Sequence, residues 1–204
     1  MKIILIGYSG HGKVVADAIF LNNIHLKKYL DIEEKKHNPH NLQFFGNDND
    51  ENIKSLISNG YKFIISVGDN LIRHKIFKKI TNLGANCQTI IHPNAFISET
   101  TEIGNGNFIS SNVSINSSSK ILDNCIINTS AIIEHDCLIK SSAHVAPGCI
   151  ICGNVQIGEG SFIGANSTVK EGVKIGNNVI IGAGSLILND IPDNAKCYGN
   201  PVKL

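Results

Sequence analysis

The dominant pattern in the C-terminal half of the chain is an aliphatic residue at every sixth position. Every sixth residue from Ile91 to Ile187 is Ile or Val. Neither the 3.6-residue period of a helix nor the two-residue period of a strand has this spacing. The register does not slip, so the stretch contains no inserted loop. A repeat this regular predicts stacked units, each made of a short strand and a turn.

A second periodic position supports this interpretation. Four residues after each aliphatic, the chain mostly places a small or β-branched residue, and Gly, Asn, Asp and Ser lie in between. Asn107 and Ile191 depart from the pattern. We expect a parallel β-helix in which three six-residue units form one triangular coil, so that residues eighteen apart stack about 4.8 Å from each other. The stretch from Ile91 to Ile187 then makes about five to six coils.

The cysteines fit the same repeat. Cys125, Cys137 and Cys149 occupy the small-residue position, which predicts a packing role. Cys149 and Cys152 form a C-x2-C pair, but no second pair follows at the spacing of a zinc ribbon. We therefore expect buried thiols and no metal.

The N-terminal part has a different pattern, in which apolar runs alternate with helical spacing. The expected strands are residues 2–7, 29–31 and 62–67, the expected helices are 13–21, 53–58 and 71–83, and residues 35–43 form a polar surface loop. Alternating strands and helices predict a small parallel α/β sheet. We expect two domains, which comprise residues 1–86 and 87–204.

Composition and charge narrow the function classes. The 204 residues include 42% hydrophobic and 17% charged residues, and the formal net charge is +1. Without clustered Lys and Arg, a nucleic-acid surface is not expected. The first apolar run stops at Gly7, too short for a signal sequence or a membrane span. We expect a cytoplasmic protein with no membrane insertion.

A glycine-rich turn joins the first strand to the first helix, in the sequence G-Y-S-G-H-G-K at residues 7–13. Free N–H groups at such a junction bind phosphates. The Ser or Thr of a P-loop is replaced by Val14, and the third glycine of the dinucleotide fingerprint is replaced by Val15. The alternative is a purely structural turn.

The six-residue repeat resembles the hexapeptide-repeat acyltransferases, and the whole chain resembles the PglD/NeuD-type sugar acetyltransferases. The motifs are G-x-S-G-H-G-K-V-V-A-D at residues 7–17 and G-D-N-x-x-R at residues 68–73. The resemblance implies a Rossmann-like domain, a left-handed β-helix, a homotrimer, acetyl-CoA and a nucleotide-linked amino sugar, with a UDP-linked 4-amino-dideoxy sugar as the best-known acceptor. Carried over as substrate-binding residues are Ser9, Gly10, His11, Asp31, Gly68, Asn70 and Arg73. Asn70 and Arg73 are expected to reach phosphate from a helix start.

Acetyl transfer to an amine needs a base for the amine proton and an N–H donor for the carbonyl oxygen. Among eight histidines, His135 stands out within Glu134-His135-Asp136, three ionisable residues in a repeat of Ile, Ser, Asn and Gly. A solvent-exposed turn is the alternative. The segment N-T-S-A-x-x-E-H-x-C at residues 128–137 resembles the family's catalytic units. It implies that His135 is the general base, Asp136 its orienting partner in place of a more usual Glu, and Asn128 a substrate contact.

The resemblance also implies residues for acetyl-CoA. His144, expected at a corner of its unit, lies near the thiol end, and the Gly153 N–H faces the acetyl carbonyl. Ala165 and Ala183 leave a groove for the pantetheine arm. The G-N-P-V-K tail at residues 199–203 resembles the family's closing segment, which caps the coil edge.

Three other functions compete with an amino-sugar acetyltransferase. A metal lyase of the γ-carbonic-anhydrase type would use His92, His135 and His144 as ligands, but their spacing does not resemble that family. An O-acetyltransferase acting on sialic acid or a polysaccharide precursor could use the same base. A non-catalytic scaffold would not need the ionisable cluster.

Overall fold

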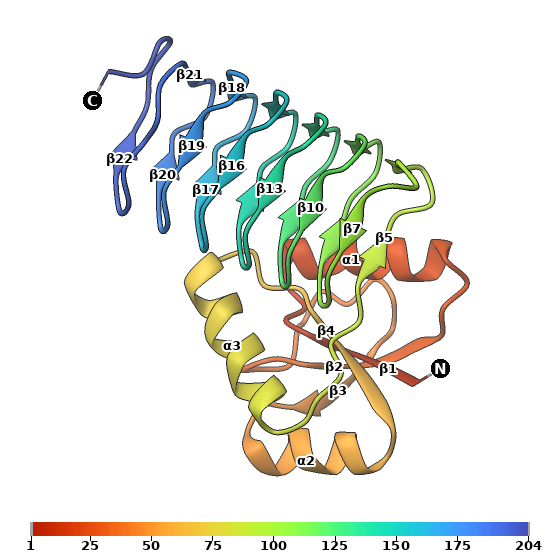
Figure 1. Ribbon diagram of the computed structural model, residues 1–204. Coiled ribbons are helices and arrows are strands. Elements are labelled where there is room, and N and C mark those ends of the chain that lie inside the picture. Colours follow the sequence, from red (N-terminus) through yellow and green to blue (C-terminus); the bar gives the residue numbers. More distant parts are fainter. Residues whose placement is uncertain (1, 204) are drawn as a thin grey trace.

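The computed structural model describes residues 2–203 and shows two domains in sequence (Figure 1). The first is an α/β domain with a parallel sheet in the order β3-β2-β1-β4. The second is a parallel β-helix that extends away from it. The first domain consists of β1 (Lys2–Ile6), α1 (Gly10–Leu21), β2 (Leu26–Leu30), β3 (Gln43–Gly46), α2 (Asp50–Ser58), β4 (Tyr61–Ile65) and α3 (Asn70–Asn82).

The predicted N-terminal elements are confirmed apart from β3 (Gln43–Gly46), which was missed. This strand pairs only with β2, at the edge of the sheet, and no residue of it is fully buried. Only Phe44 and Phe45 of this edge strand pack on the core, one on each face, so it lacks the long apolar run that marked β1 and β4. Helices α2 and α3 start at side-chain caps, in which Asn49 accepts from the Asn52 N–H and Asp69 from the Ile72 N–H.

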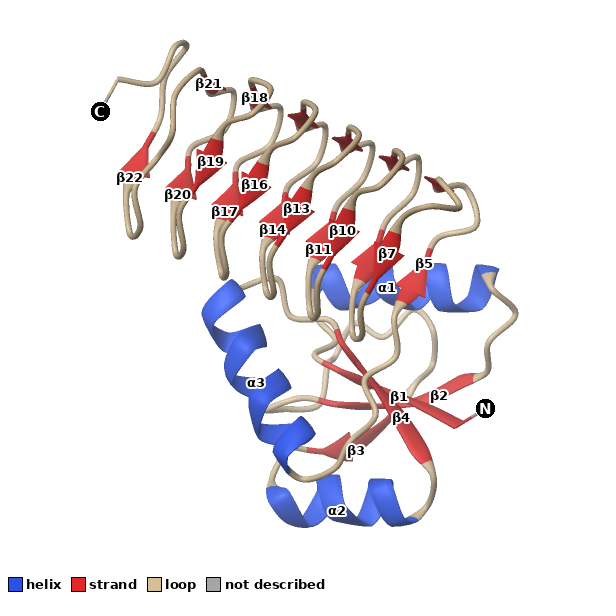
Figure 2. Cartoon of the chain, in the orientation of Figure 1, coloured by secondary structure: helices blue, strands red, loops and turns tan. Residues whose placement is uncertain are grey.

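Three parallel sheets form the sides of the β-helix within residues 2–203 (Figure 2). The seven-stranded sheet contains β5 (Ile90–Ile91), β8 (Phe108–Ile109), β11 (Ile126–Ile127), β14 (His144–Val145), β17 (Phe162–Ile163), β20 (Ile180–Ile181) and β22 (Lys196–Cys197). The six-stranded sheet contains β6 (Phe96–Ile97), β9 (Ser114–Ile115), β12 (Ile132–Ile133), β15 (Ile150–Ile151), β18 (Thr168–Val169) and β21 (Leu186–Ile187). The five-stranded sheet contains β7 (Glu102–Ile103), β10 (Lys120–Ile121), β13 (Leu138–Ile139), β16 (Gln156–Ile157) and β19 (Lys174–Ile175).

The predicted six-residue register is confirmed. From β5 to β18 each strand pairs with the strand eighteen residues further along, as Ile127 does with Val145, whereas β20 pairs with β22 at a step of sixteen, Ile180 with Lys196. From Ile109 onward the periodic aliphatic residues are buried and form one core. Cys125, Cys137 and Cys149 are buried in that core, as their small-residue position predicted.

A third periodic position, which the sequence analysis did not identify, is a turn residue with positive φ at every sixth position. Asn and Gly tolerate this left-handed conformation better than other residues, and this explains their frequency in the turns. The residues between β8 and β20 that adopt it are Asn112, Ser118, Asn124, Ser130, Asp136, Ser142, Gly148, Asn154, Gly160, Asn166, Gly172 and Asn178.

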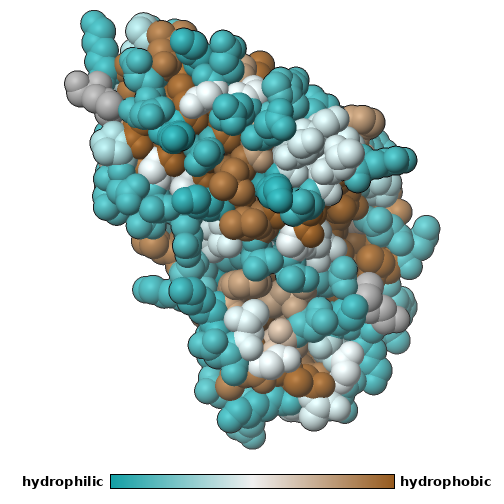
Figure 3. Space-filling view, in the orientation of Figure 1, coloured by the Kyte–Doolittle hydropathy of each residue, from teal (hydrophilic) through white to brown (hydrophobic). Residues whose placement is uncertain are grey.

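The α/β domain packs on the outer face of the seven-stranded sheet. Ile90, Phe108 and Ile126 point outward from the β-helix and are buried in one cluster with Val15 and Ile19 of α1. Figure 3 shows apolar side chains gathered across the middle of the molecule, near this junction. Burial of these outward residues in a shared core ties the two domains together.

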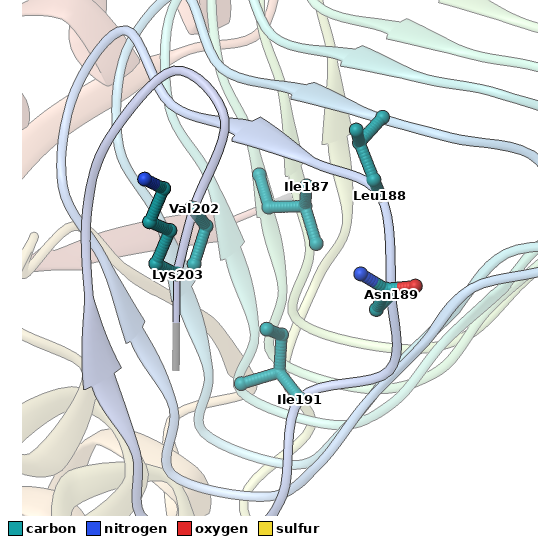
Figure 4. Close-up of a pocket in the computed structure, with 6 residues that line it drawn as sticks. All are labelled: Ile187, Leu188, Asn189, Ile191, Val202 and Lys203. Atoms are coloured by element: carbon teal, nitrogen blue, oxygen red, sulfur yellow. The ribbon is translucent and has the colours of Figure 1, made fainter.

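The tail closes the far end of the β-helix. The Val202 N–H donates to the Leu186 carbonyl at 2.9 Å, and Val202 packs against the β-helix core. Figure 4 shows Val202 and Lys203 lining a cavity of about 270 Å³ with Ile187 and Ile191. The tail therefore covers the last coil, as predicted. No helix within residues 2–203 has the length and apolar character needed to cross a membrane.

We predict that the cysteines of the repeat are chemically silent in the native protein. Burial raises the pKa of the Cys125 thiol to about 12 and that of Cys137 to about 11, so both stay protonated at pH 8. After brief treatment with iodoacetamide at pH 8, mass spectrometry should find label on the partly exposed Cys152 and none on Cys125. The control is the unfolded chain, in which all cysteines react. Label on native Cys125 would contradict the packing role.

Candidate active site

Two loops of the α/β domain meet at the carboxyl ends of β1 and β4. The loop after β1 carries Ser9, Gly10 and His11, and the loop after β4 carries Gly68. In parallel sheets this edge is where ligands bind. Gly12 allows the first turn of α1 to lie close to the end of β1, because a Cβ at residue 12 would lie only 2.4 Å from the Gly7 carbonyl oxygen. Ser9 precedes α1 without capping it, so its hydroxyl and the first N–H groups of the helix are available to an anion.

His11 points from α1 toward the β-helix. Its ring packs edge-on against Phe108 at 5.4 Å, and its Nε2 atom is buried without a hydrogen-bond partner among the described residues. Burial, and then the nearby charge of Arg73, lower the pKa of His11 to about 4. His11 is therefore neutral at physiological pH, with one polar atom available for a ligand.

His144 lies close to His11 on the outer face of β14. The sequence analysis placed His144 at a corner; the structure places it in the strand, 7% exposed. Its Nε2 lies 3.2 Å from the amide nitrogen of Asn128, whose oxygen accepts from the Thr129 N–H. This network makes Nε2 the acceptor and leaves the proton on Nδ1, which has no partner among residues 2–203.

The environment also keeps His144 neutral. Burial, then the charges of Arg73 and His11, lower the pKa of His144 to about 3. His144 is thus neutral at neutral pH, with its proton on Nδ1 available as a hydrogen-bond donor.

A cavity of about 490 Å³ opens beside His144, between the loop after β4 and the seven-stranded sheet. Phe162, edge-on to the His144 ring at 5.0 Å, Ile180 and Lys196 line its floor, and Gly68 lines its wall. The sequence analysis missed this apolar floor. The signal was present, because Phe162 and Ile180 follow His144 at steps of eighteen residues.

Arg73 and Asn70 are not free to bind phosphate in this space, although Asn70 lines it. The Arg73 side chain is 1% exposed and donates to backbone carbonyls and to the Asn70 oxygen. The Asn70 amide nitrogen donates to the carbonyl of Gly160 at 2.9 Å. Phosphate contacts by these two residues do not fit this geometry, because their hydrogen-bonding groups are already occupied.

Asp31 ends β2 next to the glycine-rich loop, as expected. Its carboxylate accepts from the Tyr8 N–H at 2.8 Å and pairs with Lys35 at 3.1 Å. The carboxylate thus fixes the start of the loop that carries Ser9 and His11. Lys35 supplies a positive charge at the same edge of the sheet.

His135 and Asp136 form a pair on the corner between the six-stranded and five-stranded sheets. His135 Nδ1 lies 2.8 Å from the Asp136 carboxylate, so Nδ1 carries the proton and Nε2 keeps a free lone pair. The shorter side chain of Asp thus reaches the ring directly. Asp136 also has φ of 59°, a conformation that Asp tolerates better than the longer Glu. His135 is exposed, and Glu134 precedes it on the same turn.

Gly153 lies one coil above His135. A Cβ at Gly153 would stand 2.7 Å from His135 Nε2, so only glycine leaves room for this ring. The Gly153 N–H donates to no acceptor among residues 2–203. The lone pair of His135 Nε2 thus lies against a glycine whose N–H makes no backbone hydrogen bond among residues 2–203.

Within one chain the predicted residues form two groups. His11, Gly68, Asn128 and His144 lie together at the seven-stranded sheet. Glu134, His135, Asp136 and Gly153 lie on the opposite corner of the triangular coil. Ala165 and Ala183 follow β17 and β20, and are therefore on the side of the first group. Residues 2–203 contain no group of three side chains suited to a metal.

Two protein-family models match the chain. The PglD N-terminal domain matches residues 2–80, and the bacterial transferase hexapeptide (six repeats) matches residues 154–189. A comparison with curated proteins finds no match.

Solved structures match over the full length. PerB from Caulobacter crescentus, in complex with CoA and GDP-perosamine, is 31% identical over 100% of this chain and 96% of that chain, with a TM-score of 0.93. The acetyltransferase domain of PglB from Neisseria gonorrhoeae, in complex with acetyl coenzyme A, is 32% identical over 99% of this chain and 98% of that chain, with a TM-score of 0.91. WeeI from Acinetobacter baumannii, 22% identical over 100% and 99% with a TM-score of 0.87, shares the fold.

We predict that His144 makes the protein acid-sensitive. The unfolded histidine binds a proton near its ordinary pKa of 6.5, whereas the folded one does so only near 3, so stability falls as pH drops through this window. The loss is about 1.4 kcal/mol of unfolding free energy per pH unit for such a histidine. When the unfolding free energy is measured with urea between pH 6.5 and pH 4, it should fall less steeply with decreasing pH for His144→Asn than for the wild type.

The matched control is His25→Asn, at an exposed histidine, which should keep the wild-type slope. Equal slopes for His144→Asn and wild type would contradict the buried, neutral state of His144.

Proposed function

Because the chain belongs to the PglD-type family of hexapeptide-repeat sugar acetyltransferases, we propose that it transfers the acetyl group of acetyl-CoA to the amino group of a nucleotide-linked sugar. The observation that carries this proposal is the corner where the free Nε2 of His135 lies beside the Gly153 amide. Amide formation from a thioester needs these two groups, a base and an N–H donor.

His135 acts as the general base in this proposal. Acetyl-CoA supplies an activated thioester carbonyl. As the sugar amine attacks it, Nε2 takes the amine proton, and the Asp136 carboxylate on Nδ1 stabilises the resulting imidazolium. His135 then returns this proton to the departing thiolate. The Gly153 N–H donates to the carbonyl oxygen as negative charge develops there.

The cavity along the seven-stranded sheet is suited to the CoA arm. Phe162 and Ile180 offer an apolar floor for the pantetheine chain, and Lys196 offers a positive charge for phosphate at the far end. In this proposal the thioester end reaches the Nδ1 proton of His144, which is buried and makes no hydrogen bond to the described residues in the free chain. Ala165 and Ala183 leave space beside this path.

The nucleotide binds at the edge formed by Ser9, Gly10 and Asp31. The N-terminus of α1 receives the phosphates, and Lys35 beside Asp31 adds positive charge. His11 lies between this edge and His144 and contacts the sugar. Neither the N-terminus of α1 nor Lys35 distinguishes one nucleobase from another, so GDP-, UDP- and dTDP-linked amino sugars should all be tested.

We further propose that the active site forms between copies of the chain in a homotrimer. The general base lies on the corner opposite the seven-stranded sheet, whereas His11, Asn128 and His144 lie on that sheet. One chain cannot bring both groups to a single substrate. A neighbouring copy that places its corner against this sheet completes the site. The exposed Phe96 and Ile150, on the outer face of the six-stranded sheet, offer apolar contact area.

We predict that His135→Ala lowers kcat by roughly 10²- to 10⁴-fold, the usual contribution of a general base. The assay measures release of the CoA thiol with acetyl-CoA and a panel of GDP-, UDP- and dTDP-linked amino sugars. Asp136→Asn should lose activity too, because it removes the charge that balances the imidazolium. His37→Ala, at an exposed histidine away from the site, serves as the control.

Release from one amino sugar, abolished in His135→Ala, would support the class and the base together. Release only with hydroxyl acceptors such as sialic acid would replace N-acetylation by O-acetylation. Silence with every acceptor would contradict the proposed function.

The proposed site between copies predicts complementation. We expect His135→Ala and His144→Ala proteins each to lose most of their activity alone, the first for lack of a base and the second for lack of the Nδ1 donor. Refolded together at equal amounts, they should regain about a quarter of wild-type activity, because that share of trimer sites combines two intact halves. Refolding each variant alone is the control. No recovery in mixed trimers would place both histidines in the site of a single chain.

A further inference from the structure

The Arg73 side chain joins the two domains through hydrogen bonds to backbone carbonyls. Its Nη1 atom donates to Val67 at 3.2 Å and to Gly68 at 3.1 Å, both in the loop after β4. Its Nε atom donates to Asn124 at 3.0 Å, and Nη2 donates to Ser142 at 2.8 Å, both in turns of the β-helix. Arginine presents five N–H donors in a rigid fork, which suits it to hold several carbonyls at fixed positions.

Asn70 extends this contact by one coil. Its oxygen accepts from Arg73 Nη2 at 2.9 Å, and its nitrogen donates to the carbonyls of Gly160 at 2.9 Å and Ser161 at 3.1 Å. Asn124, Ser142 and Gly160 follow each other at steps of eighteen residues. Arg73 and Asn70 therefore hold α3 against three stacked turns of the β-helix. With these bonds made, all five N–H groups of Arg73 are occupied.

This contact ends at the candidate active site. Ser142, which accepts from Arg73, is two residues before His144, and the backbone of Gly68 is close enough to the His144 ring to favour its protonation slightly. The charged and titratable groups that act on Arg73 are Asp69 and Cys125, and those that act on His144 are Arg73 and His11.

We propose that Arg73, with Asn70, is a positioning residue that sets the loop at Gly68 and the α/β domain, including His11, against His144. It is not a ligand for the substrate phosphates. This inference rests on the proposed function for its kinetic readout only. Both histidines stay neutral because they are buried and, in addition, because protonation would place a second positive charge next to the guanidinium.

Kinetic and binding measurements distinguish a positioning role of Arg73 from a role in binding the substrate phosphates. In Arg73→Lys the charge remains, but the ammonium cannot reach all the carbonyls. We expect kcat to fall roughly 10- to 100-fold through misplacement of the site. The Kd of free UDP or GDP, measured by calorimetry, should stay within about threefold of wild type, whereas loss of a charged phosphate contact would raise it about tenfold or more. Weakened nucleotide binding with unchanged kcat would overturn the proposal.

Titration of the histidines by NMR tests the same geometry without activity. In Arg73→Met, the pKa values of His11 and His144 should both rise, and in Arg73→Lys they should stay low. Ile80→Ala, which removes a buried side chain on the far part of α3, is the control for general destabilisation and should change neither the pKa values nor kcat. Unchanged histidines in Arg73→Met would overturn the proposal.

If Arg73→Met does not fold, Asn70→Ser serves as the test variant, because it removes only the hydrogen bonds to Gly160, Ser161 and Arg73. A lower kcat with unchanged nucleotide affinity then supports the positioning role, and wild-type kcat overturns it. If the wild-type protein acetylates no sugar, the proposed function fails, and the histidine titration alone decides the role of Arg73.

Discussion

The structure depends on the eighteen-residue register between coils. Backbone hydrogen bonds tie each short strand to the strand one coil away, so each residue of the repeat belongs to a column. A single inserted residue would turn the interior aliphatic outward and break every later column. The register therefore constrains function as strictly as stability: His135 lies under Gly153, and His144 lies above Ile126 and below Phe162.

The outer column of the seven-stranded sheet explains where the candidate site is. Its first residues, Ile90, Phe108 and Ile126, are apolar because α1 covers them. His144 is the first polar residue of the column, one coil beyond the last residue that α1 covers. Beyond it, Phe162 and Ile180 line an open cavity. The site thus lies at the border between a buried and an open surface, where a ligand can enter and is still largely removed from water.

The histidines divide into two chemical kinds by their surroundings. His11 and His144 are buried beside Arg73 and stay neutral, which suits them to hydrogen-bond a substrate without taking its proton. His135 is exposed and shares its Nδ1 proton with Asp136, which suits it to accept a proton on Nε2. The same residue type is thus suited to recognition in one place and, in the proposed mechanism, to proton transfer in the other, because burial and charge differ between the two places.

The sequence by itself determined the β-helix, because a strict six-residue period has only one structural solution that keeps all aliphatic residues inside. The resemblance also nominated His135, Asp136 and Gly153 as site residues, and the register by itself predicts that Gly153 lies one coil from His135. The sequence could not determine what Arg73 contacts, since this depends on how α3 packs on turns far away in the chain. Only the tertiary structure decided that Arg73 joins the domains, and that the candidate site residues form two groups on opposite sides of one coil, because a linear pattern does not record which face a distant element covers.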